Sequence, residues 1–265
     1  MSARPKKSFG QHFLHDTRYI DDIVRAIAPK ADDTLVEIGP GEGALTLPLL
    51  AAAGTLTAIE LDTDLIPALM ARAAPVGLLT LLQADVLKVD FGALARERGG
   101  APLRIAGNLP YYISSPILFH CIAHATAIRD MHFMLQKEVV DRMAAAPGSK
   151  VYGRLSVMLQ LACHVVPLFE VPPAAFRPPP KVDSAVVRLV PRAAHELPAV
   201  DAEMLQQLVK AAFGQRRKTL GNALRGVLDA TAIRTVGIDP QARAEALAPA
   251  DFVRLAQQYA ALRTA

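Results

Sequence analysis

The segment RIAGNLPYYISSP, residues 104–116, places an amide side chain and two aromatic rings directly after a short apolar run. The chain has no Trp and only five Tyr, so two adjacent tyrosines on a predicted loop suggest contact with a ligand. The side-chain oxygen of Asn108 and the backbone carbonyl of Leu109 or Pro110 could together accept hydrogen bonds from an exocyclic amine. Two such acceptors draw a planar amine towards tetrahedral geometry, which prepares its nitrogen to attack an electrophilic methyl group.

The aromatic rings of the same segment allow a second interaction. Tyr111 would offer a face on which a flipped base stacks, a contact that contributes about 1–3 kcal/mol. The structural alternative is that Asn108 caps a turn before the next helix while the tyrosines fill the core. We favour this alternative for Tyr112, because one of two neighbouring aromatics often faces inward. For Asn108 and Tyr111 we favour the functional interpretation.

Glycines and acids at the ends of earlier apolar runs indicate a nucleoside site. Gly39, Gly41 and Gly43 lie in EIGPGEGALT, where a strand passes into a helix and the backbone can approach a ligand closely. Glu60 follows about 20 residues after Gly39, where an acid can accept hydrogen bonds from ribose hydroxyls. Asp85 ends the next run and could accept from an adenine amine. This pattern fits NAD as well as other adenosine cofactors, and each acid by itself could be a solvated strand end.

The elements that must position these residues follow from the apolar runs TLVEIG, LTAIEL, LTLLQAD, RIAGNL and MHFMLQ. Helical segments such as TDLIPALMARAAP separate them, so the pattern predicts a doubly wound, mainly parallel α/β sheet. Residues 155–171 and 184–191 read as β-prone runs and predict an antiparallel pair at the sheet edge. Helical spacing returns from about Asp201. We therefore expect one domain over residues 1–198 and a small helical domain over residues 199–265.

Composition narrows the class of protein. Hydrophobic residues make up 52% and charged residues 20%, as expected for a globular chain with a sizeable core. Cys121 and Cys163 can form neither a disulfide framework nor a four-ligand zinc site, so we expect buried thiols and no metal. The first residues lack an apolar signal region and no run is long enough to span a bilayer, which predicts a cytoplasmic protein with no membrane contact. The net charge is +4, and residues 201–265 hold nine Lys and Arg against six Asp and Glu.

Five motifs together resemble the bacterial ribosomal RNA small-subunit adenine dimethyltransferases: NLPY at 108–111, EIGPGEG at 37–43, KKSFGQHFL at 6–14, FRPPPKVDS at 176–184 and FGQRRKTL at 213–220. The resemblance spans nearly the whole chain. It implies a Rossmann-like S-adenosylmethionine-dependent methyltransferase domain with a C-terminal all-helical domain. It also implies dimethylation of the N6 atoms of two adjacent adenosines in the 3′-terminal hairpin loop of small-subunit (16S) ribosomal RNA. The expected partner is the immature 30S subunit, approached by a monomer during ribosome biogenesis.

The resemblance also assigns roles to individual residues. Asn108, Pro110, Tyr111 and Phe176 would form the catalytic site, with Phe176 as the second wall of the base pocket opposite Tyr111. The cofactor would be bound by His12, Leu14, Gly39, Gly41, Glu60, Asp85 and Asn108. A lone His12 would otherwise be read as a surface or capping residue.

Basic residues near these motifs are expected to hold the RNA backbone by charge. They are Lys6, Lys7, Arg177 and Lys181, together with Arg216, Arg217 and Lys218 on a predicted helix of the small domain. A solvated basic face is the alternative for the last cluster.

Three rival functions remain open on the sequence. An adenine methyltransferase acting on large-subunit RNA or on DNA would share most of the site. An NAD-dependent oxidoreductase would share the glycine turn and Glu60, but it gives no role to Asn108 and Tyr111. A ribosome-assembly factor without catalysis would need the RNA contacts alone.

Overall fold

The structure is a computed structural model that describes residues 12–215 and 217–264. The chain divides into two compact units, Met1–Val140 with Val166–Pro191 and Asp141–Val165 with Arg192–Ala265. By packing, the second unit therefore includes a segment well before the helical C-terminal region. The functional boundary expected at residue 198 stays a prediction.

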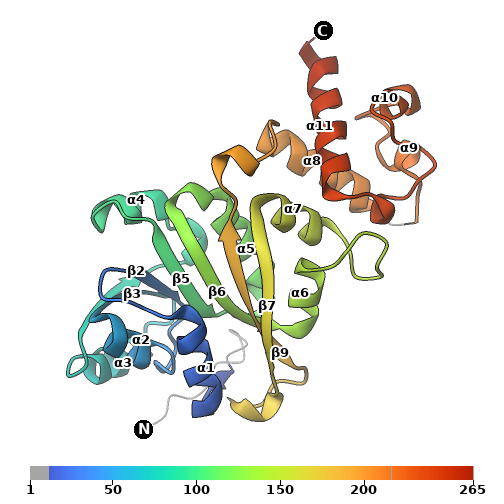
Figure 1. Ribbon diagram of the computed structural model, residues 1–265. Coiled ribbons are helices and arrows are strands. Elements are labelled where there is room, and N and C mark those ends of the chain that lie inside the picture. The colour runs from blue at the N-terminus through green and yellow to red at the C-terminus, as the bar shows by residue number, and fades with distance from the viewer. Residues whose placement is uncertain (1–11, 216, 265) are drawn as a thin grey trace. The chain divides into compact units, whose positions relative to one another are not determined.

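The first unit is built on a seven-stranded sheet with the order β4-β3-β2-β5-β6-β9-β7 (Figure 1). Neighbouring strands from β4 to β6 are parallel, and β9 is antiparallel to β6. The chain leaves β2 towards β3 and β4 on one side and later returns to add β5 and β6 on the other. This confirms the expected doubly wound sheet, and ligands bind at such a switch point between neighbouring strands. The strands are β2 (Thr34–Ile38), β3 (Thr55–Glu60), β4 (Leu78–Gln83), β5 (Leu103–Asn108), β6 (Ile128–Gln136), β7 (Cys163–Val171) and β9 (Ser184–Pro191).

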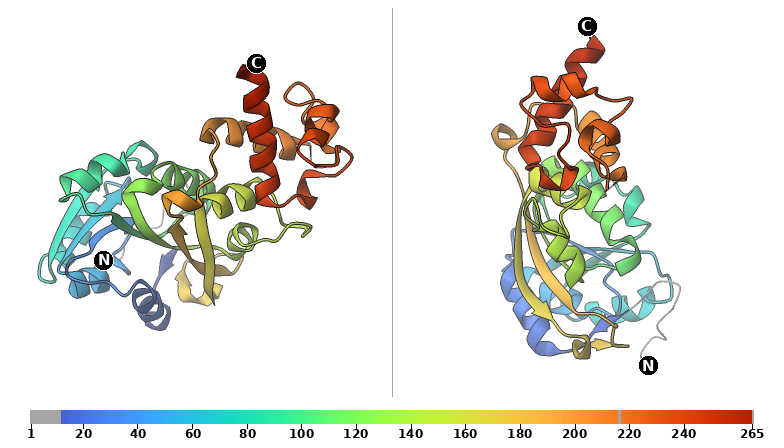
Figure 2. Two further views of the ribbon diagram at one scale, coloured as in Figure 1. Left: turned by 45° about the horizontal axis from the view of Figure 1, so that its top comes forward. Right: turned by 90° about the vertical axis from the view of Figure 1, so that its right-hand side faces the viewer.

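Helices between the strands cover the sheet, as Figures 1 and 2 show. The near-continuous apolar strands need cover on both faces, because successive side chains point to opposite sides of a sheet. Buried residues of α1, α2 and α3 join those of β2, β3 and β4 in one core cluster. The helices are α1 (Thr17–Ile27), α2 (Thr46–Ala53), α3 (Ile66–Ala73), α4 (Phe91–Glu97), α5 (Ser114–Ala123) and α6 (Lys137–Met143). Short 3-10 turns lie at Val86–Lys88, Tyr111–Ile113, Ala125–Ala127 and Pro173–Ala175.

A separate two-stranded ribbon ties the start of the described chain to the proline-rich loop. The strand β1 (Phe13–Leu14) pairs antiparallel with β8 (Phe176–Arg177), so that Leu14 faces Phe176. Both residues are buried in the core cluster. Through this pairing, residues far apart in the sequence meet beside the sheet.

The second unit is helical, with α7 (Arg154–Ala162), α8 (Ala202–Gly214), α9 (Leu220–Ala223), α10 (Ala230–Thr235) and α11 (Pro249–Thr264). Two 3-10 turns, Ala194–Glu196 and Ala244–Ala246, complete it. Phe213 of α8 stacks on Phe252 of α11 with ring centroids 5.5 Å apart. The hydroxyl of Tyr152 donates to the carbonyl of Leu247 at 2.9 Å. These contacts give the unit its own core.

The β-prone interpretation of residues 155–162 was wrong, because this segment forms most of α7. Its Leu, Met and Gln residues are good helix formers. The hydroxyl of Ser156 accepts from the amide of Gly153 at 3.1 Å, which caps the helix start. The strand begins only at Cys163. Cys121 and Cys163 are both buried, as expected.

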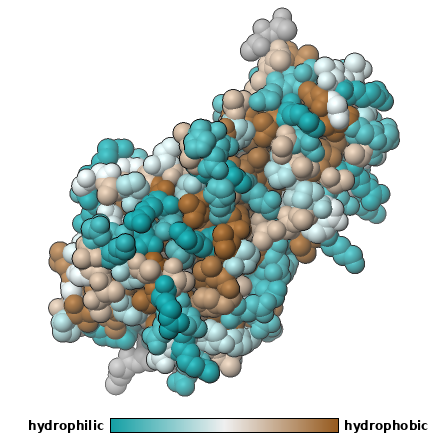
Figure 3. Space-filling view, viewed as in Figure 1, coloured by the Kyte–Doolittle hydropathy of each residue, from teal (hydrophilic) through white to brown (hydrophobic). Residues whose placement is uncertain are grey.

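The surface mixes residue types. On the face drawn in Figure 3, hydrophobic residues lie among hydrophilic ones. In the described ranges 12–215 and 217–264, no helix is long and apolar enough to cross a membrane.

Candidate active site at the carboxyl edge of the sheet

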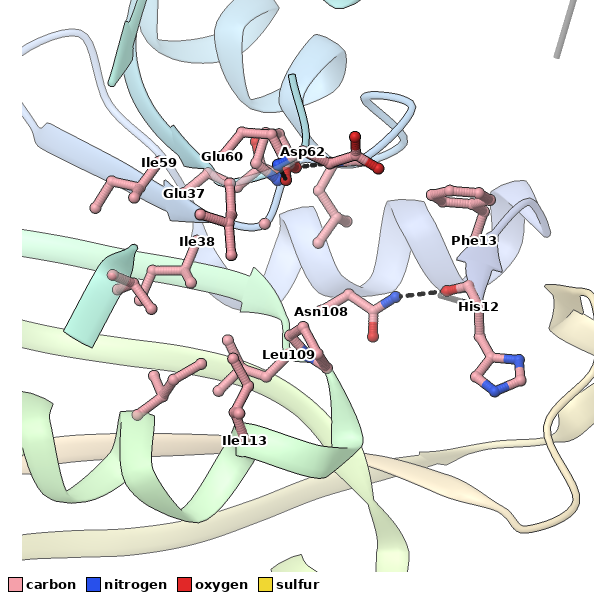
Figure 4. Close-up of a pocket in the computed structure, with 18 of the residues that line it drawn as sticks. His12, Phe13, Glu37, Ile38, Ile59, Glu60, Asp62, Asn108, Leu109 and Ile113 are labelled. Atoms are coloured by element: carbon pink, nitrogen blue, oxygen red, sulfur yellow. Dashed lines mark hydrogen bonds between the residues drawn. The ribbon is translucent and has the colours of Figure 1, made fainter. Parts of the chain in front are cut away.

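One pocket lies where β2, β3, β4 and β5 end, at the switch point of the sheet (Figure 4). Every residue expected to bind the cofactor lines it: His12, Leu14, Gly39, Gly41, Glu60, Asp85 and Asn108. Pro110 and Tyr111 line it as well. The tertiary structure thus brings together residues from four strand ends and from the β1 ribbon.

The glycine loop after β2 forms one wall of the pocket. Gly39, Gly41 and Gly43 have φ angles of 67°, 56° and 86°, which L side chains rarely adopt. A Cβ atom added to Gly43 would lie 2.7 Å from Leu69 Cδ1, and one added to Gly41 would lie 3.1 Å from the ring of Phe13. The loop therefore requires glycine both for its backbone conformation and for close packing.

Glu60 at the end of β3 is tied to this loop. Its Oε2 accepts from the Gly41 amide at 3.2 Å, and its Oε1 accepts from the Asp62 amide at 2.8 Å. Burial raises the pKa of Glu60, while these amide hydrogen bonds act in the opposite direction. The carboxylate is thereby held in one orientation towards the pocket, with lone pairs left for a ligand.

Asp85 is positioned in a similar way beyond β4. Its Oδ1 accepts from the Leu87 amide at 3.0 Å and caps the 3-10 turn Val86–Lys88. Among the described residues, no hydrogen-bond donor contacts its Oδ2. The side chain is therefore fixed by one oxygen while the other remains available as an acceptor.

Asn108, the last residue of β5, has a fixed amide orientation. Its Nδ2 donates to the carbonyl oxygen of His12 at 3.0 Å (Figure 4). A carbonyl can only accept, so the amide nitrogen must face His12 and Oδ1 must lie on the other side of the group. The side-chain oxygen of Asn108 is thus left as an acceptor that lines the pocket.

Gly107 makes this placement possible, and the sequence interpretation did not single it out. A Cβ atom there would lie 2.5 Å from the carbonyl oxygen of Ile38 on β2. Any larger residue would push the ends of β5 and β2 apart. The glycine directly before Asn108 in AGNLPY was the signal that could have identified it.

The backbone carbonyls of Leu109 and Pro110 differ in the hydrogen bonds that they accept. The carbonyl oxygen of Pro110 accepts from the Ile113 amide at 3.2 Å and closes the 3-10 turn that carries both tyrosines. Among the described residues, the carbonyl of Leu109 accepts no backbone hydrogen bond. Leu109 is thus the less engaged of the two expected backbone acceptors.

Tyr111 is held by two contacts. Its hydroxyl shares a hydrogen bond of 2.6 Å with Ser184 Oγ, and its ring stacks with the His12 ring at a centroid distance of 5.6 Å. Burial raises the pKa of the Tyr111 hydroxyl, and the Ser184 hydrogen bond opposes this rise. Ser184, the last residue of FRPPPKVDS, was not predicted as a site residue.

Two aromatic residues differ from their expected places. Tyr112 is 56% exposed and lines the pocket, so the expected core packing was wrong. Phe176 is 2% exposed in the core cluster and is not among the described residues that line the pocket. The pairing of β1 with β8 places Phe176 opposite Leu14. In this structure Phe176 therefore does not form the expected second wall of a base pocket.

The expected RNA contacts are only partly described. Arg177 and Lys181 are exposed around the proline-rich loop. Arg217 and Lys218 are exposed as well, but they lie in the turn between α8 and α9, so their placement on a helix was wrong. The helix ends at Gly214, and Thr219 precedes the next one, because the polar run between them offers no apolar face to bury. Lys6, Lys7 and Arg216 lie outside the described residues.

No group of three or more His, Cys, Asp or Glu side chains in the described ranges is arranged to hold a metal ion. Among the charged side chains, the described lining of the pocket contains acids. The acids are Glu37, Glu42, Glu60, Asp62 and Asp85, and neither Lys nor Arg belongs to the described lining.

Known proteins are similar to this chain both in sequence and in fold. The family described as ribosomal RNA adenine dimethylase matches residues 2–261. The ribosomal RNA small subunit methyltransferase A of Xanthomonas campestris pv. campestris (strain B100) is 62% identical over 255 residues, which cover 96% of each chain. A solved dimethyladenosine transferase from Plasmodium falciparum has a TM-score of 0.77 at 26% identity and covers 92% of this chain and 96% of its own. The 23S rRNA methyltransferase ErmE has a TM-score of 0.69 at 25% identity, with 94% and 99% covered.

Proposed function

The chain belongs to the ribosomal RNA adenine dimethylase family, and from this premise we infer that it is an S-adenosylmethionine-dependent rRNA (adenine-N6,N6)-dimethyltransferase. It dimethylates two adjacent adenosines in the 3′-terminal hairpin loop of small-subunit ribosomal RNA. The relative named for the small subunit is 62% identical, whereas ErmE, named for 23S rRNA, is 25% identical. This difference favours the small-subunit substrate over the large-subunit alternative.

The charge of the pocket fits S-adenosylmethionine. This cofactor carries a sulfonium and an ammonium against one carboxylate, so it is a net cation. The described lining offers five carboxylates and no Lys or Arg. A dinucleotide would instead bring a doubly negative pyrophosphate next to these acids, which like-charge repulsion disfavours. The same glycine loop therefore supports the sulfonium cofactor over NAD.

The side chains already held in place would bind the cofactor. Glu60 accepts from the ribose hydroxyls, Asp85 accepts from the adenine amine, and the backbone of Gly39 and Gly41 lets the cofactor approach β2 closely. His12 and Leu14 border the same space from the β1 ribbon. When bound, the cofactor supplies an electrophilic methyl group on its sulfonium.

Asn108 prepares the target amine. Its Oδ1 accepts one N–H of the adenine N6, and the carbonyl of Leu109 or Pro110 accepts the other. The amine lone pair is thereby drawn out of conjugation with the ring, and the nitrogen becomes a better nucleophile. Because the amide of Asn108 is already oriented by the His12 carbonyl at 3.0 Å, little reorganisation is needed when the base arrives. This fixed amide is the observation that carries the proposed function.

Tyr111 would hold the target base by stacking. Its ring is in contact with the His12 ring at 5.6 Å between centroids, so the base displaces or joins a stack that already exists. The Ser184 hydrogen bond keeps the ring in place.

The expected partner and the expected cellular location follow from this function. We expect a monomer that acts on the immature 30S subunit in the cytoplasm. Exposed cations on the proline-rich loop and after α8 would contact the RNA backbone. No metal ion is required for this transfer.

Replacing Asn108 tests the proposal. Asn108→Ala removes the preorganised acceptor, so kcat for methyl transfer to immature small-subunit particles should fall by about 100- to 1000-fold. Modified adenosines are mapped in the RNA by mass spectrometry, and cofactor affinity is measured by calorimetry. An undiminished rate would contradict the role of Asn108.

Further measurements on the wild-type protein and on Asn108→Ala separate the rival functions. Methylation of large-subunit RNA in preference to small-subunit particles would change the substrate assignment. Tight NAD binding without S-adenosylmethionine binding would overturn the cofactor assignment. Normal subunit assembly by Asn108→Ala without methylation would show that the protein also acts as an assembly factor.

A further inference from the structure

Tyr112, the residue after Tyr111, carries an aromatic ring that the mechanism above does not use. It is 56% exposed and lines the pocket. Within residues 12–215 and 217–264, its side chain makes no hydrogen bond and stacks on no other ring, whereas Tyr111 does both. An exposed aromatic ring at the mouth of a nucleotide pocket offers a stacking face that the described part of the protein leaves unused.

The 3-10 turn that carries Tyr112 is held in place before any ligand binds. The Ile113 amide donates to the Pro110 carbonyl at 3.2 Å. The Ser114 hydroxyl donates to the Tyr111 carbonyl at 3.1 Å. Figure 4 shows Ile113, the last residue of the turn, among the side chains that line the pocket. The turn therefore presents Tyr112 from a fixed position, so little conformational entropy is lost when a base stacks on it.

The two neighbouring tyrosines face different directions. A 3-10 helix has three residues per turn, so consecutive side chains point about 120° apart. Tyr111 is directed towards Ser184, which its hydroxyl contacts at 2.6 Å, and its ring stacks with the His12 ring. The ring of Tyr112 is consequently directed to another part of the pocket mouth, where a second base can reach it.

The charge of the pocket favours contacts with bases over contacts with phosphates. The described lining holds five carboxylates and neither Lys nor Arg, so it repels the phosphates of an RNA chain. A neutral ring binds a base instead, and every base has a face that can stack. The nucleotides next to the pocket are therefore best held through their bases.

We propose that Tyr112 is a second base-stacking residue, which holds the adenosine adjacent to the target base while that target occupies the pocket against Tyr111. The proposal rests on the proposed function, because it assumes a substrate loop with two adjacent adenosines. Its consequence is that the neighbouring base, in addition to the target base, determines the efficiency of methyl transfer.

Substitutions of Tyr112 test the stacking face. Tyr112→Ala removes the ring and should lower kcat/KM for immature small-subunit particles by about 5- to 150-fold, whereas Tyr112→Phe keeps the ring and should stay near the wild-type value. Cofactor affinity, measured by calorimetry, should be unchanged in both variants. Because Tyr112 is exposed, the midpoint of urea unfolding should stay unchanged as well. Leu78→Ala, at an exposed apolar position where β4 begins, is the matched control and should change none of these quantities.

The identity of the neighbouring base provides the sharper test. In small-subunit particles, one of the two target adenosines is replaced by guanosine, which keeps a purine face but has no amine at position 6, or by uridine, which stacks more weakly. For one of the two replaced positions, the wild-type protein should methylate the remaining adenosine several-fold faster beside guanosine than beside uridine. Tyr112→Ala should abolish this difference, as expected for a double-mutant cycle between two groups in contact.

Other results would overturn the proposal. An undiminished rate in Tyr112→Ala, or a loss that is the same beside guanosine and beside uridine at both positions, would show that the ring does not hold the neighbouring base. Weaker cofactor binding by Tyr112→Ala would assign the ring to the cofactor site. A Tyr112→Phe variant as slow as Tyr112→Ala would assign the effect to the hydroxyl. Wild-type protein that methylates neither adenosine of unmodified particles would instead contradict the proposed function.

Discussion

At the residue scale, Tyr111 separates the contribution of a ring from that of a hydroxyl. Tyr111→Ala removes the stacking face and should lower kcat/KM for the RNA substrate by about 5- to 150-fold, equivalent to about 1–3 kcal/mol. Tyr111→Phe keeps the ring and loses only the hydrogen bond to Ser184, so kcat/KM for the RNA substrate should fall only several-fold. Cofactor affinity, measured by calorimetry, should stay unchanged in both variants.

Ser184→Ala provides the matched control for Tyr111. If the 2.6 Å hydrogen bond only positions the ring, Ser184→Ala should lower kcat/KM for the RNA substrate by the same factor as Tyr111→Phe. The double variant should then lose no more kcat/KM than either single variant. A Phe variant as inactive as the Ala variant would instead assign a catalytic role to the hydroxyl.

At the element scale, a buried charge network joins three strands and a helix at the edge of the sheet opposite the pocket. Arg104 on β5 donates to Asp130 on β6 at 3.0 Å and to Asp33, just before β2, at 2.6 Å. It also donates to the carbonyl of Ile27 at the end of α1 at 2.6 Å. Arg104→Met should lower the free energy of unfolding by about 3–5 kcal/mol, because the buried carboxylates of Asp33 and Asp130 lose the guanidinium that is buried with them.

Arg129 offers a control within the same network. It also pairs with Asp33, at 3.0 Å, but its side chain is 57% exposed. Arg129→Met should therefore lower the free energy of unfolding by at most about 1 kcal/mol. Urea unfolding at neutral pH measures the free energy of unfolding of the two variants. An equal loss of this free energy in both would show that burial does not determine the strength of these ion pairs.

The network also predicts how stability depends on acid. Burial would raise the pKa of Asp33, but the hydrogen bonds from Arg104 and Lys30 outweigh it and hold this pKa below its usual value. The unfolded state therefore takes up the proton first, so the contribution of Asp33 is full above about pH 4 and is lost as the pH falls further. Arg104→Met should flatten this part of the stability curve, and an unchanged acid dependence would contradict the assignment.

At the scale of the whole molecule, the basic excess lies in residues 201–265. Arg217→Ala with Lys218→Ala should weaken RNA binding and reduce the slope of log K against log salt by about 1 to 2, as expected when two phosphate contacts are lost. Lys210→Ala with Arg234→Ala, at exposed positions on α8 and α10, removes the same charge and should have less effect. Filter binding over a range of salt concentrations measures both slopes.

The outcome of this comparison also tests the role of the turn. Equal effects of the two pairs would indicate a general contribution of charge. A collapse of cofactor affinity in the first pair would show that Arg217 and Lys218 are structural.

Much of the site could be predicted from local sequence patterns. Short apolar runs predict where strands end, and Gly39, Glu60, Asp85 and Asn108 all lie at or just after such ends. Because parallel strands of one sheet end at the same edge, their convergence on one pocket could be expected before any contact was known. The same reasoning failed for residues 155–162, where an apolar run interpreted as β-prone forms a helix.

Contacts between distant segments were decided only by the tertiary structure. The ribbon of β1 and β8 buries Phe176, the turn after Pro110 exposes Tyr112, and Ser184 meets Tyr111 across 73 positions of the chain. Residue type and spacing determine which groups reach the edge of the sheet, because they depend on local backbone periodicity. Burial and pairing depend on packing between remote segments, and no local pattern contains that information.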